Sequence, residues 1–163
     1  MMIVCSICGL TIGFCIGVVL TYKYVANSMQ NQVKKAEKIA DKHLAIMNLF
    51  SVWIQNRDNN LAISSYLLNK NIRSVAIYGM SFVGERLYDE LERSEITVGY
   101  CIDKNANNIY KDTLVVTPDS LPENIEIDAV IVSAFTFYDE IKNELEKKMD
   151  VPILSIDDIV YCL

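Results

Sequence analysis

The stretch of this sequence that most constrains the fold runs from Ser74 to Asp103. It begins with a short apolar run, Val75 to Tyr78, which predicts a buried strand. A turn with glycines at positions 79 and 84 follows, then an amphipathic helix from Val83 to Glu92, and then a second strand that ends at Asp103. This succession of strand, glycine turn, helix, strand and acid is typical of the opening of a Rossmann-type unit.

The glycine turn predicts a nucleotide site. Glycine at 79 lets the chain turn sharply off the strand, the helix N-terminus offers N–H groups to a phosphate, and Asp103, 24 residues later, is placed to accept ribose hydroxyls. The pattern is G-x-S-x-x-G, because Ser81 replaces the glycine that would let a pyrophosphate approach the backbone most closely. The candidate ligand-binding residues are Gly79, Met80, Ser81, Val83, Gly84, Asp103, Lys104 and Ser133. The alternative is a Rossmann scaffold whose glycines serve only packing.

The rest of the C-terminal part continues the alternation of strands and helices. Ala129 to Ser133 is apolar throughout, as expected of a central parallel strand, and Phe137 to Lys148 has helical spacing. Pro152 to Ser155 predicts a last strand. The expected fold class is α/β, a small doubly wound parallel sheet of about five strands in the order 3-2-1-4-5, with its ligand crevice above Gly79 and Ser133.

The N-terminal part predicts a membrane anchor. Met1 to Tyr22 carries no charge, and its apolar run is long enough for a bilayer core. A cleaved signal peptide would need a basic start, which this sequence lacks. We therefore expect a transmembrane helix over residues 1–25, a helical stalk over 26–70 and a Rossmann-like domain over 71–163. Lysines after the apolar run place the C-terminal domain in the cytoplasm of a single-pass protein, with the lipid bilayer as a partner.

Two patterns in this part bear on self-association. Gly9, Gly13 and Gly17 recur every four residues, a spacing that permits close helix approach and a homodimer. Residues 28–55 show three-and-four spacing, which fits either a parallel coiled coil or a solvated helix whose end packs on the domain. Since the early part of this segment has few large apolar residues, the solvated helix is the preferred interpretation.

Charge and cysteine content exclude several functions. Residues 71–163 carry eight basic against eighteen acidic residues, so nucleic acid is not an expected partner. The five cysteines and the single histidine, His43, show no metal-ligand spacing, and no metal site is expected.

A family resemblance adds to this picture. At IYGMSFVGERLYDEL, YCIDKN, DAVIVSA and YDEIKNEL the sequence resembles small Rossmann-like domains of bacterial capsule and cell-surface polysaccharide biosynthesis proteins. The resemblance implies a nucleotide, nucleotide-sugar or NAD-type ligand over the glycine turn and Asp103. It also implies an accessory or regulatory role in cell-surface glycan assembly, with glycan-assembly proteins as partners.

Catalytic groups are sparse. Tyr138-x-x-x-Lys142 mimics the tyrosine and lysine pair of short-chain dehydrogenases and sugar epimerases, in which the lysine lowers the tyrosine pKa. The pair lies too close to the glycine turn for that family, so we regard Tyr138 and Lys142 as weak candidates. A binding module is expected rather than an enzyme; a ligand-free interaction scaffold and a nucleotide-sugar oxidoreductase or epimerase remain as alternatives.

Overall fold

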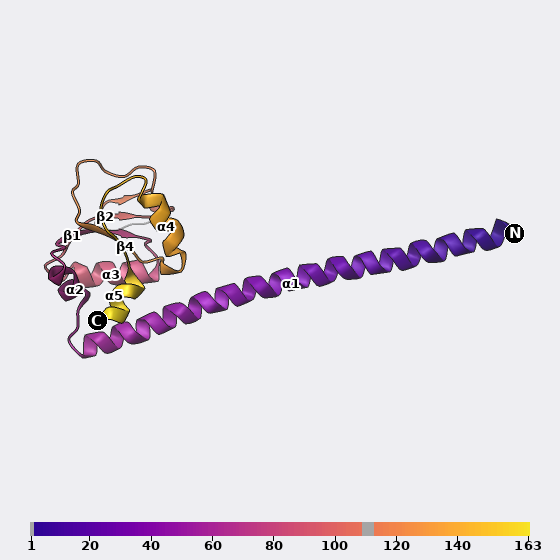
Figure 1. Cartoon of the computed structure of the whole chain (residues 1–163), viewed down its shortest axis with the longest axis horizontal. Helices are drawn as coiled ribbons and strands as arrows, with labels where there is room; N and C mark the ends of the chain where they lie inside the picture. The colour runs from indigo at the N-terminus through magenta and orange to yellow at the C-terminus, as the bar shows by residue number, and fades with distance from the viewer. Residues whose placement is uncertain (1, 109–112) are drawn as a thin grey trace. The chain divides into compact units, whose positions relative to one another are not determined.

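The computed structural model describes residues 2–108 and 113–163, and the side chains of residues 2–16, 18, 19 and 108 lie outside that description. The chain divides into two compact units, Met1–Leu44 and Ala45–Leu163, and α1 (Met2–Asp58) supplies the first unit and the start of the second. The other elements, drawn in Figure 1, are α2 (Ile63–Asn69), β1 (Ser74–Tyr78), α3 (Phe82–Leu91), β2 (Thr97–Ile102), β3 (Val115–Val116), β4 (Ala129–Val132), α4 (Tyr138–Leu145), β5 (Ile153–Ser155) and α5 (Ile156–Cys162).

The sheet confirms the predicted topology. Its five strands are parallel and lie in the order β3-β2-β1-β4-β5, with β1 in the centre. Within it Ala76 of β1 pairs with Tyr100 of β2 on one side and with Val130 of β4 on the other. Because the strands are parallel, their carboxyl ends meet at one edge, and the glycine turn after β1 lies at that edge.

Alternate residues of the central strands enter two separate cores. On one face Val75, Ile77 and Ile131 pack with the apolar sides of α3 and α5, together with α2 and the end of α1. On the other face Ala76 and Val130 pack with Ile141 and Leu145 of α4. Burial on both faces explains why these strands are continuous apolar runs in the sequence.

Within the second unit, the end of α1 and the start of α2 are held to α3 and α5 by hydrogen bonds as well as by packing. The Trp53 indole Nε1 donates to the Glu90 carboxylate at 2.7 Å, and the Ile63 N–H donates to the same carboxylate at 3.2 Å. The buried Asn56 amide donates to the Val160 carbonyl at 2.7 Å. Residues 45–58 are therefore part of the folded domain. This agrees with the preferred sequence interpretation, in which the end of this helix packs on the domain.

The membrane prediction requires correction. Among the residues whose side chains the structure describes, no helix has a segment both long and apolar enough to cross a bilayer. The uncharged run on which the prediction rested falls largely outside that description. A transmembrane helix over residues 1–25 and a single-pass membrane location with a cytoplasmic C-terminal domain are therefore not supported. Of the three glycines of the predicted packing face, Gly9 and Gly13 lie outside the residues whose side chains are described. At Gly17, which is described, a Cβ would meet nothing within 4 Å.

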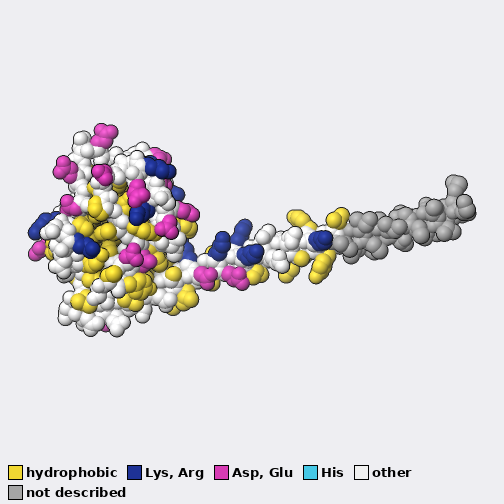
Figure 2. Space-filling view, viewed as in Figure 1, with side chains coloured by type: hydrophobic (Ala, Val, Ile, Leu, Met, Phe, Trp, Pro, Cys, Tyr) yellow, Lys and Arg dark blue, Asp and Glu magenta, His cyan; other side chains and the backbone are white. Residues whose placement is uncertain are grey.

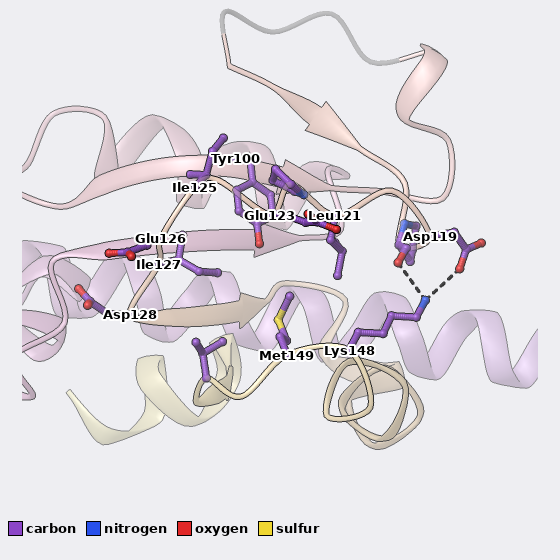
Figure 3. Close-up of a pocket in the computed structure, with 13 residues that line it drawn as sticks. Tyr100, Asp119, Leu121, Glu123, Ile125, Glu126, Ile127, Asp128, Lys148 and Met149 are labelled. Atoms are coloured by element: carbon purple, nitrogen blue, oxygen red, sulfur yellow. Dashed lines mark hydrogen bonds and ion pairs between the residues drawn. The ribbon is translucent and has the colours of Figure 1, made fainter.

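The connection between β3 and β4 leaves one part of the sheet without a helical cover. Residues 117–128 form no helix, and the Pro118 and Pro122 positions explain why this segment does not continue as one. A groove of about 740 Å³ lies beside this segment, over Tyr100 of β2, with Ile127 and Met149 along it (Figure 3).

Candidate functional site

The turn after β1 is built on two glycines in close contact. Gly79 has φ of +93°, a conformation that residues with a side chain rarely adopt. At Gly84, in the first turn of α3, a Cβ would lie 1.9 Å from the Gly79 carbonyl oxygen. The hydroxyl of the buried Ser133 donates to that same oxygen from the end of β4. Gly84 and Ser133 thus hold the turn in place.

Asp103 also supports the turn. One oxygen of its carboxylate accepts the Met80 N–H at 2.7 Å, and the other accepts the Asn105 N–H at 2.8 Å. Each oxygen has a second lone pair, so the carboxylate retains the capacity to accept a ligand hydroxyl. Its first role in this structure is to tie the glycine turn to the end of β2.

A crevice of about 410 Å³ opens at the carboxyl ends of β1 and β4. Four of the predicted ligand-binding residues line it: Gly79, Ser81, Asp103 and Lys104. The other four predicted residues are Met80, Val83, Gly84 and Ser133, which are buried and do not line it. They support the turn and the packing of α3 beneath the crevice. The structure therefore brings the predicted residues together, with half of them at the crevice surface.

Tyr78 lines this crevice and has a buried hydroxyl. The side chain is 3% exposed, and its Oη has no hydrogen-bond partner among the described residues. Burial raises the pKa of the Tyr78 phenol above its ordinary value of 10.0, and the negative charges of Glu144 and Asp103 raise it further. The hydroxyl therefore keeps its proton at neutral pH and is available as a donor.

One wall of the crevice, on the side of α4, consists of residues that were not predicted as ligand-binding. Phe137, Glu140, Ile141 and Glu144 line it from this side, and Phe137 is 48% exposed. In the sequence, these residues recur at intervals of three and four directly after an apolar strand. That spacing indicates a helix face at this edge of the sheet. With Asp103 these residues give the crevice three carboxylates against the single ammonium group of Lys104.

Ser81 is the N-cap residue of α3, but its side chain makes no capping bond. The residue is exposed at the crevice, and the first intrahelical bond runs from the Glu85 N–H to the Ser81 carbonyl at 2.9 Å. The preceding N–H groups of the first turn have no intrahelical acceptor and carry the positive end of the helix dipole. This corner is where the crevice best accepts negative charge.

Tyr138 and Lys142 do not form a proton-transfer pair in this structure. The Tyr138 hydroxyl donates to the Ile153 carbonyl at 2.7 Å, and Lys142 lies 3.8 Å from the Glu146 carboxylate. Burial raises the pKa of Tyr138 despite the nearby Lys142, which is opposite to the shift that a tyrosine base requires. The Tyr138 bond joins α4 to β5, and the Lys142 contact lies at the end of α4.

The groove over Tyr100 is bordered by Lys148, which connects the segment after β3 with α4. The Lys148 ammonium group donates to the Pro118 carbonyl and to the Asp119 carboxylate, each at 2.9 Å (Figure 3). It also donates to the Glu144 carboxylate at 3.2 Å. These bonds raise the pKa of Lys148 above its ordinary value of 10.5. Lys148 therefore fixes the helix-free connection to the end of α4. No three His, Cys, Asp or Glu side chains among the described residues are grouped so as to hold a metal ion.

Comparison with known proteins identifies the family. The family model described as C2185-like, N-terminal, matches residues 70–156, which is just over half of the chain. The chain belongs to the C2185-like N-terminal domain family. The matched region of this C2185-like domain begins just before β1 and includes both the glycine turn and the crevice.

One relative among the curated proteins is a serine/threonine-protein phosphatase, UIS2, of Plasmodium berghei (strain Anka). It is 28% identical over 132 residues, which cover 71% of this chain and 10% of the phosphatase. The C2185-like chain thus spans about a tenth of the length of that relative, and the phosphatase activity is a property of the longer protein. No solved structure matches the chain.

These comparisons correct the family resemblance drawn from the sequence. The matching family is C2185-like, and neither match is to a bacterial capsule or cell-surface polysaccharide biosynthesis protein. The motifs behind that resemblance, the glycine turn and the strand ending in Asp103, are common to Rossmann-like folds in general. For this reason they predicted the fold correctly and the family wrongly.

Proposed function

We propose that the C2185-like domain is a nucleotide-binding module with its ligand in the crevice between the glycine turn and α4. The observation that carries this proposal is the Tyr78 hydroxyl, which is buried and has no partner among the described residues, in a residue that lines the crevice. A buried hydroxyl without a hydrogen bond costs about 1 to 3 kcal/mol of stability. A ligand acceptor group at this position would remove that cost.

The arrangement of charge supports one orientation of the ligand. Its phosphates lie at Ser81 and the first turn of α3, where N–H groups and the helix dipole favour negative charge. Its ribose lies at Asp103, whose oxygens keep lone pairs for hydroxyl groups. The opposite end carries Glu140 and Glu144, so the part of the ligand placed there is uncharged or positive. NAD and nucleotide-sugars meet these conditions.

The second candidate function is a ligand-free interaction scaffold. Asp103 favours it, because both carboxylate oxygens already accept backbone N–H groups and so have a structural role without any ligand. Ser81 also favours it, since a side chain at this position obstructs the approach of a pyrophosphate to the backbone. The unpartnered Tyr78 hydroxyl is what makes us prefer the binding module.

The test is a thermal-shift and calorimetric screen of the whole chain against NAD, NADP, UDP-glucose and coenzyme A, repeated with Tyr78→Phe. The substitution removes only the hydroxyl. We expect it to weaken binding of the active compound by about 1 kcal/mol, roughly fivefold, and not to lower the melting temperature. Asp103 should repel the 2′-phosphate of NADP and favour NAD over it.

Tyr138→Phe is the matched control, since it also removes one tyrosine hydroxyl. That hydroxyl donates to the Ile153 carbonyl, so the control should lose about 1 kcal/mol of stability and keep its affinity. Absence of binding by every compound at millimolar concentration, in wild type and in Ser81→Gly, would favour the scaffold instead.

A further inference from the structure

The part of α1 in the first unit carries exposed apolar side chains. Tyr22 is 75% exposed, Met29 62% and Val33 55%. Figure 2 shows hydrophobic side chains at the surface of the part of this helix that it colours. Most of the stability of a protein helix comes from packing of its apolar face against another element. The exposed side chains therefore point to a partner surface.

The spacing of these residues identifies the kind of partner. Seven positions alternate at intervals of four and three residues, namely Tyr22, Ala26, Met29, Val33, Ala36, Ala40 and His43. A period of 3.5 residues keeps an apolar row facing a second helix only when the two helices supercoil. This heptad row lies within the uninterrupted helix Met2–Asp58, so no break disturbs its register. The row fits another helix of the same period better than a sheet or a globular surface.

The charged residues indicate that this second helix is a copy of the first. The lysines at 34, 35, 38 and 42 and the acid at 41 all lie on the outer positions of the heptad, away from the row. Of the positions that flank the row between residues 22 and 44, only Lys23 and Glu37 are charged. Two identical helices can therefore approach along this row without bringing like charges together.

The flanking residues also favour one direction. In a parallel coiled coil, the last residue of each heptad lies opposite the residue five positions later on the other helix, and both of these residues flank the row. This places Ile39, 56% exposed, opposite Leu44 of the second copy, which is also 56% exposed. It also places the neutral Gln32 opposite Glu37. The third such pair sets the apolar Val25, 48% exposed, opposite the polar Gln30, so two of the three pairs match in polarity.

We propose that two copies of this chain associate through residues 22–44 of α1 as a parallel, in-register coiled coil. This goes beyond the proposed nucleotide-binding function and does not depend on it. It replaces the solvated-helix interpretation for this segment, because the helix is continuous and its heptad row is exposed. The glycine-based homodimer predicted from the sequence lies in a different segment of the helix.

Sedimentation equilibrium of the full chain tests the association. The wild type is expected to be dimeric at micromolar concentration. Met29→Glu places a charge in the row and should raise the dimer dissociation constant at least about tenfold. Asn31→Glu adds the same charge at the outermost heptad position and should change it by less than about twofold. The melting temperature of the second unit should be the same in both variants, because its folded core does not include these residues.

Energy transfer between donor and acceptor dyes attached to the amino termini of separate chains tests the direction. A parallel pair brings the two termini together and gives efficient transfer in mixed dimers. A monomeric wild type, or equal losses from Met29→Glu and Asn31→Glu, would overturn the proposal. Dimers without transfer between the terminal dyes would overturn the parallel arrangement.

Discussion

Gly84 lies so close to Gly79 that a Cβ at position 84 would be 1.9 Å from the Gly79 carbonyl oxygen. This nearest atom belongs to the backbone and cannot move aside as the end of a flexible side chain would. We expect Gly84→Ala to push α3 away from β1 and to destabilise the domain by about 3 kcal/mol or more, measured by urea unfolding. Gly17→Ala is the control, since a Cβ there meets nothing within 4 Å. Equal unfolding curves for the wild type and Gly84→Ala would contradict the close contact.

Asp103 gives a second prediction about the same turn. Asp103→Ala removes the acceptor for two backbone N–H groups, those of Met80 and Asn105. Hydrogen bonds to a charged group contribute about 1.5 to 3 kcal/mol each, so the substitution should destabilise the fold as well as weaken ligand binding. Asp103→Asn keeps one side-chain carbonyl oxygen as an acceptor and should therefore lose less stability than Asp103→Ala. Native stability in Asp103→Ala would show that these bonds are dispensable, leaving the carboxylate available for a ligand alone.

The contrast between the two sides of the crevice shows how much the sequence could predict. Apolar runs and glycine spacing gave the strands, their order and the turn, because these patterns depend on burial and backbone geometry that are local to the chain. The Tyr78 hydroxyl could not be assigned in the same way. Whether a strand tyrosine has a hydrogen-bond partner depends on α4, which follows it by sixty residues.

The role of Asp103 shows a second limit. Its position at the end of β2 was predicted, and it does line the crevice. Its two bonds to backbone N–H groups depend on the conformation of the loops around it, which no spacing rule encodes. The N-terminal prediction relied on the length of an uncharged apolar run, and no helix among the residues whose side chains are described has a segment long and apolar enough for a span.

Asp128 should make the stability of the domain depend on pH in acid. Its carboxylate accepts the N–H groups of Arg73 and Ser74 at 2.8 and 2.9 Å, and these bonds lower the pKa of Asp128 below its ordinary value of 3.8. A lowered folded-state pKa adds stability above pH 3.8 that disappears as the pH falls through the folded value. In urea unfolding, the free energy of unfolding of the wild type should be larger than that of Asp128→Asn at neutral pH, and the two values should converge in acid. A gap that stays constant down to the lowest pH would refute this assignment.

Lys148 should act at the opposite end of the pH range. Its bonds to Asp119 and Glu144 raise the pKa of Lys148 above 10.5, so its contribution is complete below that pH and is lost as the pH rises through the folded value. Lys148→Met should therefore lower the urea midpoint at neutral pH by an amount that shrinks above pH 10.5. Lys147→Met, at the exposed neighbouring position, provides the control. Similar losses in both variants at every pH would argue against an anchoring role for Lys148.

The most direct measurement of the central claim is a backbone amide NMR titration of the chain with NAD and with UDP-glucose. If a nucleotide binds in the crevice, the signals of Gly79, Ser81 and Lys104 should shift with a single saturable dependence on its concentration. Those of Ile125 and Ile127, in the groove over Tyr100, should not move. Shifts confined to that groove, or no shifts at millimolar nucleotide, would contradict the proposed nucleotide site.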